Sequence, residues 1–168
     1  MALFSKVHIM SRQAIENMSQ HAKYDGNPVV IISITDFDEP QAQILAQSWI
    51  HQIIRLRFDD VYEDEPHAMT HTDAIRITKF AADCTRKNYE LWVQCEGGVA
   101  RSAAVAAGLL TLFGEDDEWI WRDPKYYPNI YVYRLMLGPL WVIEEKDIRR
   151  KQVLNVKAYK AKEEADDE

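Results

Sequence analysis

A cysteine and an arginine enclose a short, glycine-containing loop in the middle of the chain. Cys95 and Arg101 are separated by five residues, and Ser102 follows directly. The five residues between them are Glu96, Gly97, Gly98, Val99 and Ala100. An apolar run at residues 91–93 precedes this Cys95 loop (residues 95–101) and an alanine-rich segment at 102–113 follows it, which predicts a strand, a loop and a helix start. A thiol, a guanidinium and free backbone amides are the groups needed to attack and hold a phosphate ester.

The expected position of the loop explains what these groups can do. A loop that ends at a helix start points its free N–H groups, here those of residues 96–101, into one concavity at the positive end of the helix dipole. Such a concavity binds a phosphate dianion, and the same field stabilises a thiolate at Cys95. Arg101 can hold two phosphoryl oxygens with its planar fork, which a lysine cannot do. Gly98 lets the backbone approach the anion, and Ser102 can donate a hydrogen bond to the departing sulfur.

These residues also carry a family resemblance. Cys95, Gly98, Arg101 and Ser102 match the signature Cys-x-x-Gly-x-x-Arg-Ser/Thr, so the chain resembles the cysteine-dependent protein tyrosine phosphatases, in particular the compact dual-specificity type. Residues 127–135 resemble the Pro-Asn segment that opens a late helix in that type. The resemblance implies hydrolysis of phosphotyrosine, with phosphoserine and phosphothreonine as further candidates, through a cysteinyl-phosphate intermediate. It implies a phosphorylated protein or peptide as substrate and neither a metal nor another cofactor.

One position departs from the family pattern. These phosphatases usually place histidine before the cysteine, whereas this chain has Gln94. A glutamine amide can still donate and accept hydrogen bonds, so the reaction type is expected to persist. A catalytically idle phosphate-binding module remains an alternative. A phosphatase of a small molecule or of an RNA 5′ end is another, because the same loop serves those substrates.

The resemblance further implies an aspartate, a few dozen residues before the cysteine, that protonates the leaving oxygen. Three aspartates, Asp59, Asp60 and Asp64, lie in an acidic stretch at residues 59–66, which we call the acid loop. Asp60 is the first candidate because it stands just past the end of an expected strand, and the other two remain alternatives. Asn129 could orient the attacking water or simply cap its helix, and capping is favoured.

Other reactive side chains have simpler interpretations. His67 and His71 are four residues apart but lack a strong third ligand, so we predict no metal site. Cys84 is expected to be a small core residue, with a disulfide to Cys95 as the alternative.

Composition limits the class of protein. The chain has 168 residues, 47% of them hydrophobic, which is enough for one sizeable core. The formal charge of −7 argues against a general affinity for nucleic acid or for anionic membranes. Neither a signal peptide nor a membrane span is apparent, and one of the two cysteines must stay a free thiol. We therefore expect a cytoplasmic protein.

The elements that must position the loop follow from the periodicity of apolar residues. Strands are expected at residues 7–10, 29–34, 50–58 and 91–94, and helices at 11–22, 41–48, 72–88, 102–113 and 129–137. Their alternation predicts an α/β fold with a central, largely parallel sheet flanked by helices, as in the protein tyrosine phosphatases. Ligands of such sheets bind at the carboxyl ends of strands. The loops that follow Ile34, Phe58 and Gln94 should therefore converge.

The two ends of the chain are expected to differ. Residues 1–142 are predicted to form the phosphatase domain, and residues 143–168 a charged C-terminal extension. This extension mixes charged and apolar residues before an acidic end, which favours a helix or a docking segment, with a partner-binding tail as the alternative.

Overall fold

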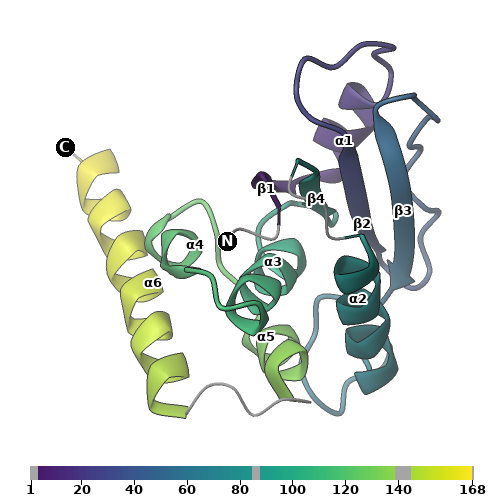
Figure 1. The fold of residues 1–168 in the computed structure, drawn as a ribbon. Coiled ribbons are helices and arrows are strands. Elements are labelled where there is room, and N and C mark those ends of the chain that lie inside the picture. Colours follow the sequence, from purple (N-terminus) through teal and green to yellow (C-terminus); the bar gives the residue numbers. More distant parts are fainter. Residues whose placement is uncertain (1–3, 85–87, 139–144, 168) are drawn as a thin grey trace.

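The structure, a computed structural model, describes residues 4–84, 88–138 and 145–167. Strands and helices alternate along much of the chain (Figure 1). The strands are β1 (Lys6–Met10), β2 (Val29–Thr35), β3 (Ile50–Arg57) and β4 (Glu90–Gln94). The helices are α1 (Arg12–Met18), α2 (His71–Asp83), α3 (Arg101–Leu112), α4 (Glu118–Arg122), α5 (Ile130–Leu137) and α6 (Glu145–Asp166). No helix within the described residues is long and apolar enough to span a lipid bilayer.

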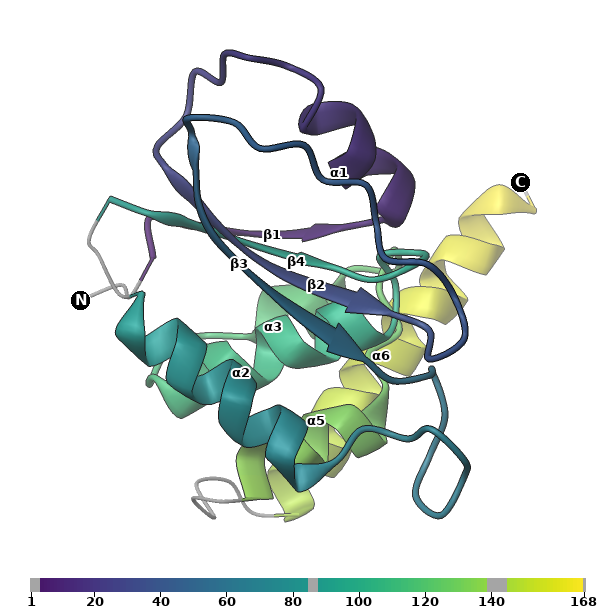
Figure 2. The ribbon, with the colours of Figure 1, turned by 90° about the vertical axis from the view of Figure 1, so that its right-hand side faces the viewer.

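The four strands form one parallel sheet in the order β1-β4-β2-β3. Every residue of β2 is buried, as expected for a β-branched run in a sheet that is covered on both faces. Ile32 of β2 lies opposite Val93 of β4 and Ile54 of β3. Helix α1 covers one face, and α2, α3 and α5 cover the other (Figure 2). The predicted α/β fold with a central parallel sheet is confirmed.

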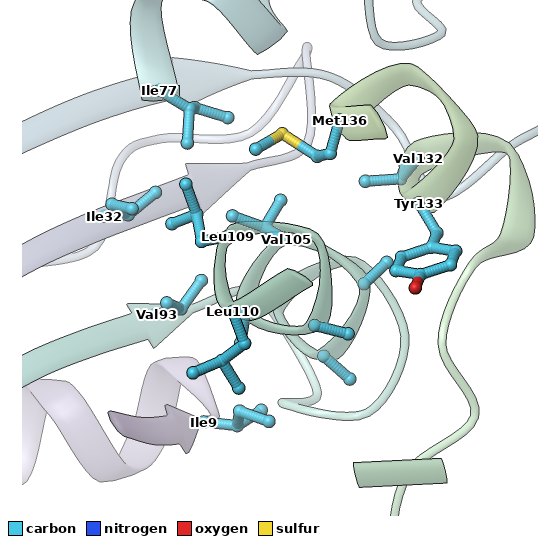
Figure 3. Packing of buried hydrophobic residues seen from close by; sticks show 14 of the residues in the cluster. Ile9, Ile32, Ile77, Val93, Val105, Leu109, Leu110, Val132, Tyr133 and Met136 are labelled. Carbon is cyan, nitrogen blue, oxygen red and sulfur yellow. The ribbon is translucent and has the colours of Figure 1, made fainter. Parts of the chain in front are cut away.

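Helix α3 lies at the centre of the core. Its small residues allow close packing against the sheet: Ala103, Ala104, Ala106 and Ala107. Gly108 faces α5 so closely that a Cβ there would lie 2.5 Å from the Cβ of Met136. Figure 3 shows Leu110 of α3 between Val93 and Ile9 of the sheet. This packing fixes the helix whose first residue is Arg101.

One predicted helix is wrong. Residues 41–48 form no helix, because side chains from other elements bind part of their backbone. The guanidinium of Arg12 donates to the carbonyl of Gln41 at 3.0 Å, and that of Arg55 donates to the carbonyl of Ala42 at 3.0 Å. These long-range hydrogen bonds replace those that a helix would make within itself.

The ends of other helices differ from the predicted ends by a few residues. Helix α1 ends at Met18 rather than near residue 22, and the short helix α4 was not predicted. Helix α2 ends at Asp83, and part of its predicted continuation, residues 85–87, lies outside the described residues. The predicted domain boundary between residues 142 and 143 also lies outside them.

Helix α6 docks through buried polar side chains. Lys151 Nζ lies 2.8 Å from the Asp117 carboxylate and donates to the Tyr133 hydroxyl at 2.9 Å, which in turn donates to Asp117 at 2.9 Å. Burial, followed by the charge of Asp117, raises the pKa of Tyr133, so this phenol stays protonated as a donor. Asn155 Nδ2 donates to the carbonyl of Trp121 at 3.1 Å. These bonds attach α6 to α4 and α5.

Replacing Lys151 with alanine should destabilise the protein by about 3–5 kcal/mol, because it leaves the buried carboxylate of Asp117 without its countercharge. Urea denaturation followed by circular dichroism measures this loss. Arg150→Ala is the matched control on the same helix, since it removes only an exposed partner of Glu118 and should leave the midpoint near the wild-type value. Equal midpoints for the two variants would contradict the expected contribution of the buried pair.

Candidate active site

The loops that follow β2, β3 and β4 converge at the carboxyl edge of the sheet, as predicted. Arg101 connects them, because its Nη1 donates to the Phe58 carbonyl after β3 at 2.8 Å and to the Asp36 carboxylate after β2 at 2.5 Å. Cys95 follows β4 directly. Asp36 was not among the predicted site residues. A carboxylate placed directly after a buried parallel strand was the sequence signal that could have indicated it.

The Cys95 loop is anchored to the junction between β1 and α1. The Cys95 N–H donates to the Met10 carbonyl at 3.3 Å, and the Arg12 N–H donates to the Glu96 carbonyl at 3.0 Å. Gly98 has φ of 66°, and a Cβ there would lie 2.6 Å from the carbonyl carbon of Met10. Glycine is therefore required at this position for two reasons, its backbone conformation and the close approach of Met10.

The thiol lies at the start of α3. The Sγ of Cys95 is 3.1 Å from the Oγ of Ser102, and both residues are buried. Ala100 occupies the N-cap position and has no side-chain group that could cap the helix. The first N–H groups of α3 thus lack a side-chain cap and can bind an anion beside the sulfur.

Arg101 has an unpaired donor. Its side chain is only 5% exposed, and within the described residues its Nε has no hydrogen-bond partner. A buried guanidinium N–H without an acceptor costs free energy, and such groups are rare in folded proteins. An oxyanion held by the Cys95 loop would supply the missing acceptor.

Gln94 forms a bridge between β2 and the Cys95 loop. Its amide oxygen accepts from the Ser33 hydroxyl at 2.5 Å, and its amide nitrogen donates to the carbonyls of Cys95 at 3.1 Å and Ile34 at 3.4 Å. The glutamine is 1% exposed, and these three bonds use both its donor and its acceptor group. Gln94 therefore connects the start of the Cys95 loop to β2.

Asn129 joins Asp60 to the Cys95 loop. Its Oδ1 accepts from the Val132 N–H at 3.1 Å, which caps α5 as predicted. Its Nδ2 also donates to Asp60 Oδ1 at 2.8 Å and to the Val61 carbonyl at 3.1 Å. The Asn129 N–H donates to the Ala100 carbonyl at 3.1 Å. Asp60 is thereby held next to the loop, a second role of Asn129 that the sequence did not indicate.

The other two aspartates of the acid loop are placed differently. Asp59 Oδ1 accepts from the Phe37 N–H at 2.8 Å, and its Oδ2 is 3.6 Å from His67 Nδ1. The rings of Phe37 and His67 stack with centroids 3.9 Å apart. Asp59 in the acid loop and His67 directly after it therefore both contact the loop after β2. Asp64 is exposed, with φ of 66°. Of the three, only Asp60 is bonded to the residue that adjoins the Cys95 loop.

The second cysteine is remote from the first. Cys84 follows α2 and lies 3.0 Å from Gln52 Oε1 near the start of β3, whereas Cys95 follows the far end of the parallel strand β4. Burial, followed by the charge of Asp83, raises the pKa of the Cys84 thiol. Both cysteines are free, and their positions at opposite ends of the sheet disfavour the alternative of a disulfide between them.

Comparisons with known proteins return solved structures. No protein-family model matches the chain, and neither does any curated protein sequence. The structure is similar to Tk-PTP in its active form, with 11% identity, 92% of each chain covered and a TM-score of 0.46. It is similar to human DUSP28, with 14% identity over 95% of this chain and 94% of that one, and a TM-score of 0.41. For PTPMT1 the identity is 18%, the coverage 83% and 89%, and the TM-score 0.49.

Proposed function

We propose that this protein is a phosphatase of phosphotyrosine in proteins or peptides, with phosphoserine and phosphothreonine as further candidate substrates. The observation that carries the proposal is the buried Arg101, whose Nε has no partner within the described residues. Arg101 begins a helix without a side-chain cap, and the next residue of that helix, Ser102, lies 3.1 Å from the Cys95 sulfur. A phosphoryl group would satisfy that donor and the loop amides together. Its phosphorus would then lie within reach of the thiolate of Cys95.

The first step transfers the phosphoryl group to sulfur. The Cys95 thiolate attacks phosphorus in line with the leaving oxygen, the bond from phosphorus to that oxygen breaks, and Asp60 donates its proton to the oxygen. Arg101 and the N–H groups of residues 96–101 hold the three non-bridging oxygens while charge redistributes over them.

The second step releases phosphate. A water molecule attacks the cysteinyl-phosphate, and the Asp60 carboxylate takes the proton that the water loses. The sulfur–phosphorus bond breaks, and the Ser102 hydroxyl, 3.1 Å from Sγ, donates a hydrogen bond to the departing thiolate. Both steps use only groups of the chain and water.

Two features favour turnover of a protein substrate over the alternatives. The idle-module alternative arose from Gln94, and the bridge that Gln94 forms with Ser33 and Cys95 supports a loop held in place for reaction. The formal charge of −7 weakens the alternative of an RNA 5′ end.

A free Cys95 needs a reducing compartment, so we place the protein in the cytoplasm.

A substrate panel tests the proposal. Phosphotyrosine peptides, an aryl phosphate, nucleotides and phosphoinositides are assayed side by side for release of inorganic phosphate. We expect turnover of the aryl phosphate and higher kcat/KM for the peptides than for nucleotides or phosphoinositides. No turnover of any of them would identify an idle module.

Asp60→Asn tests the proposed acid. Phosphotyrosine has a poor leaving group, so its hydrolysis should depend on a proton donated by the Asp60 carboxyl. The variant cannot donate this proton and should slow phosphotyrosine hydrolysis by roughly 10²–10⁴-fold. An aryl phosphate with a very acidic leaving group needs little protonation and should be affected far less.

Asp59→Asn and Asp64→Asn are the matched controls for the acid. The first keeps an oxygen that can accept from the Phe37 N–H, and the second changes an exposed turn, so both should keep the wild-type rate with phosphotyrosine. A comparable loss of rate in one control, with Asp60→Asn unchanged, would assign the acid to the aspartate changed in that control.

A further inference from the structure

A small cavity lies between the acid loop, residues 127–130 and α6. Apolar and aromatic side chains form much of its wall: Tyr62 from the acid loop, Tyr127, Ile130, and Val156 from α6. Its volume is about 110 Å³. Pockets that hold whole small molecules measure roughly 300–1,000 Å³, so this cavity has room for one side chain rather than for a ligand of that size.

Two walls of the cavity are connected to the groups that handle phosphate. The Tyr127 N–H donates to the Val99 carbonyl of the Cys95 loop at 3.0 Å. Tyr62 follows Asp60 by two residues in the acid loop. A side chain in the cavity would therefore lie next to the phosphorylated residue bound in the Cys95 loop, and would belong to the same substrate.

The wall formed by α6 is fixed in place. Asn155, which precedes Val156, donates to the carbonyls of Trp121 and Tyr126 at 3.1 and 2.9 Å. The ring of Tyr159 packs edge-on against Tyr127, with centroids 5.7 Å apart. Figure 2 shows the C-terminal end of α6 on the same side of the molecule as the ends of the strand arrows. The helix thus holds Val156 in the wall of the cavity from a docked position.

These walls still have apolar surface to bury. Tyr62 is 51% exposed, Tyr127 50% and Val156 45%. Covering such surface with an aliphatic or aromatic side chain is favourable, whereas a charged side chain would lose hydration there.

We propose that this cavity receives an apolar side chain close to the phosphorylated residue of a peptide substrate, which makes α6 a substrate-recognition element. The inference rests on the proposed function in one respect: the occupant is part of the phosphorylated peptide. Recognition then depends on the C-terminal helix as well as on the Cys95 loop.

Two substitutions of Val156 test the proposal from opposite directions. Val156→Ser removes part of the apolar wall, and Val156→Trp fills the cavity. Val153→Ser and Val153→Trp are the matched controls, because Val153 is 52% exposed on the same helix and is not a wall residue. The substrates are an aryl phosphate and a set of phosphotyrosine peptides. Each peptide carries leucine or serine at one of the three positions before or the three positions after the phosphotyrosine.

We expect the wild type to prefer leucine over serine about tenfold in kcat/KM at one position of the peptide. Both Val156 variants should lose this preference and keep the wild-type rate with the aryl phosphate, and both Val153 variants should retain the preference. The absence of a leucine preference at every position, or its persistence in Val156→Trp, would overturn the proposal.

Binding measurements separate this proposal from the proposed function. Fluorescence anisotropy gives the affinity of the same peptides for Cys95→Ser and for this variant combined with Val156→Trp. A leucine preference in binding that Val156→Trp removes, found without any turnover, would support the cavity and overturn the phosphatase activity. Turnover of the aryl phosphate with no leucine preference in binding would support the phosphatase activity and overturn the cavity proposal. A Val156 effect confined to nucleotide 5′-phosphates would assign the cavity to a base and overturn the peptide proposal.

Discussion

Cys95→Ser is expected to abolish turnover and to retain substrate binding. A serine hydroxyl keeps its proton at neutral pH, so the nucleophile is lost, and rates should fall by a factor on the order of 10⁶ or to the detection limit. The loop amides and Arg101 are untouched, so a phosphotyrosine peptide should still bind. Steady-state assays with an aryl phosphate and calorimetric titration of the peptide measure the two effects.

The second cysteine provides the control for this result. Cys84→Ser also exchanges a buried thiol for a hydroxyl, beside Gln52 at the other end of the sheet, and should keep wild-type turnover. Residual turnover above a few per cent in Cys95→Ser would show that another group attacks phosphorus. Inactivation by Cys84→Ser would show that the assay reports folding rather than chemistry.

Arg101→Lys should lower kcat by roughly 10²–10³-fold although it keeps the positive charge. Lysine has no planar fork, so it cannot bind two phosphoryl oxygens while also bonded to Asp36 and the Phe58 carbonyl, as the arginine is. The loss is measured as kcat and KM with the aryl phosphate, beside a thermal denaturation curve that reports folding.

Arg134→Lys on α5 is the control for arginine chemistry in general. Arg134 is half-exposed and pairs with Glu145, so its substitution should leave the rate unchanged. A rate for Arg101→Lys within tenfold of wild type, with normal folding, would mean that Arg101 serves only to connect the three loops.

The helices and strands divide into those that local sequence determines and those that it does not. The continuous β-branched run of β2 and the alanine-rich α3 were predicted nearly to the residue, because burial on all sides leaves an unmistakable apolar pattern. Residues 41–48 have a composition that suits a helix, yet Arg12 and Arg55 bind their backbone from elements that are distant in sequence. The local sequence of residues 41–48 does not show that these distant arginines compete with helical hydrogen bonds for their carbonyls.

The candidate site divides in the same way. The sequence identified Cys95, Gly98, Arg101 and Ser102 as a unit, because these residues lie within eight consecutive positions and the backbone geometry of a strand, loop and helix start follows from neighbouring residues. Their identity and spacing were enough to derive the expected chemistry.

The packing of distant elements determines which groups surround that unit. The position of Asp60 next to the Cys95 loop depends on the hydrogen bond from Asn129, which is 69 residues away in sequence. The role of Gln94 depends on Ser33, 61 residues away. Position in the sequence could rank Asp60 first among the three neighbouring carboxyls. It could not show the bonds of Asp60 and Gln94, because these form only when distant elements pack together.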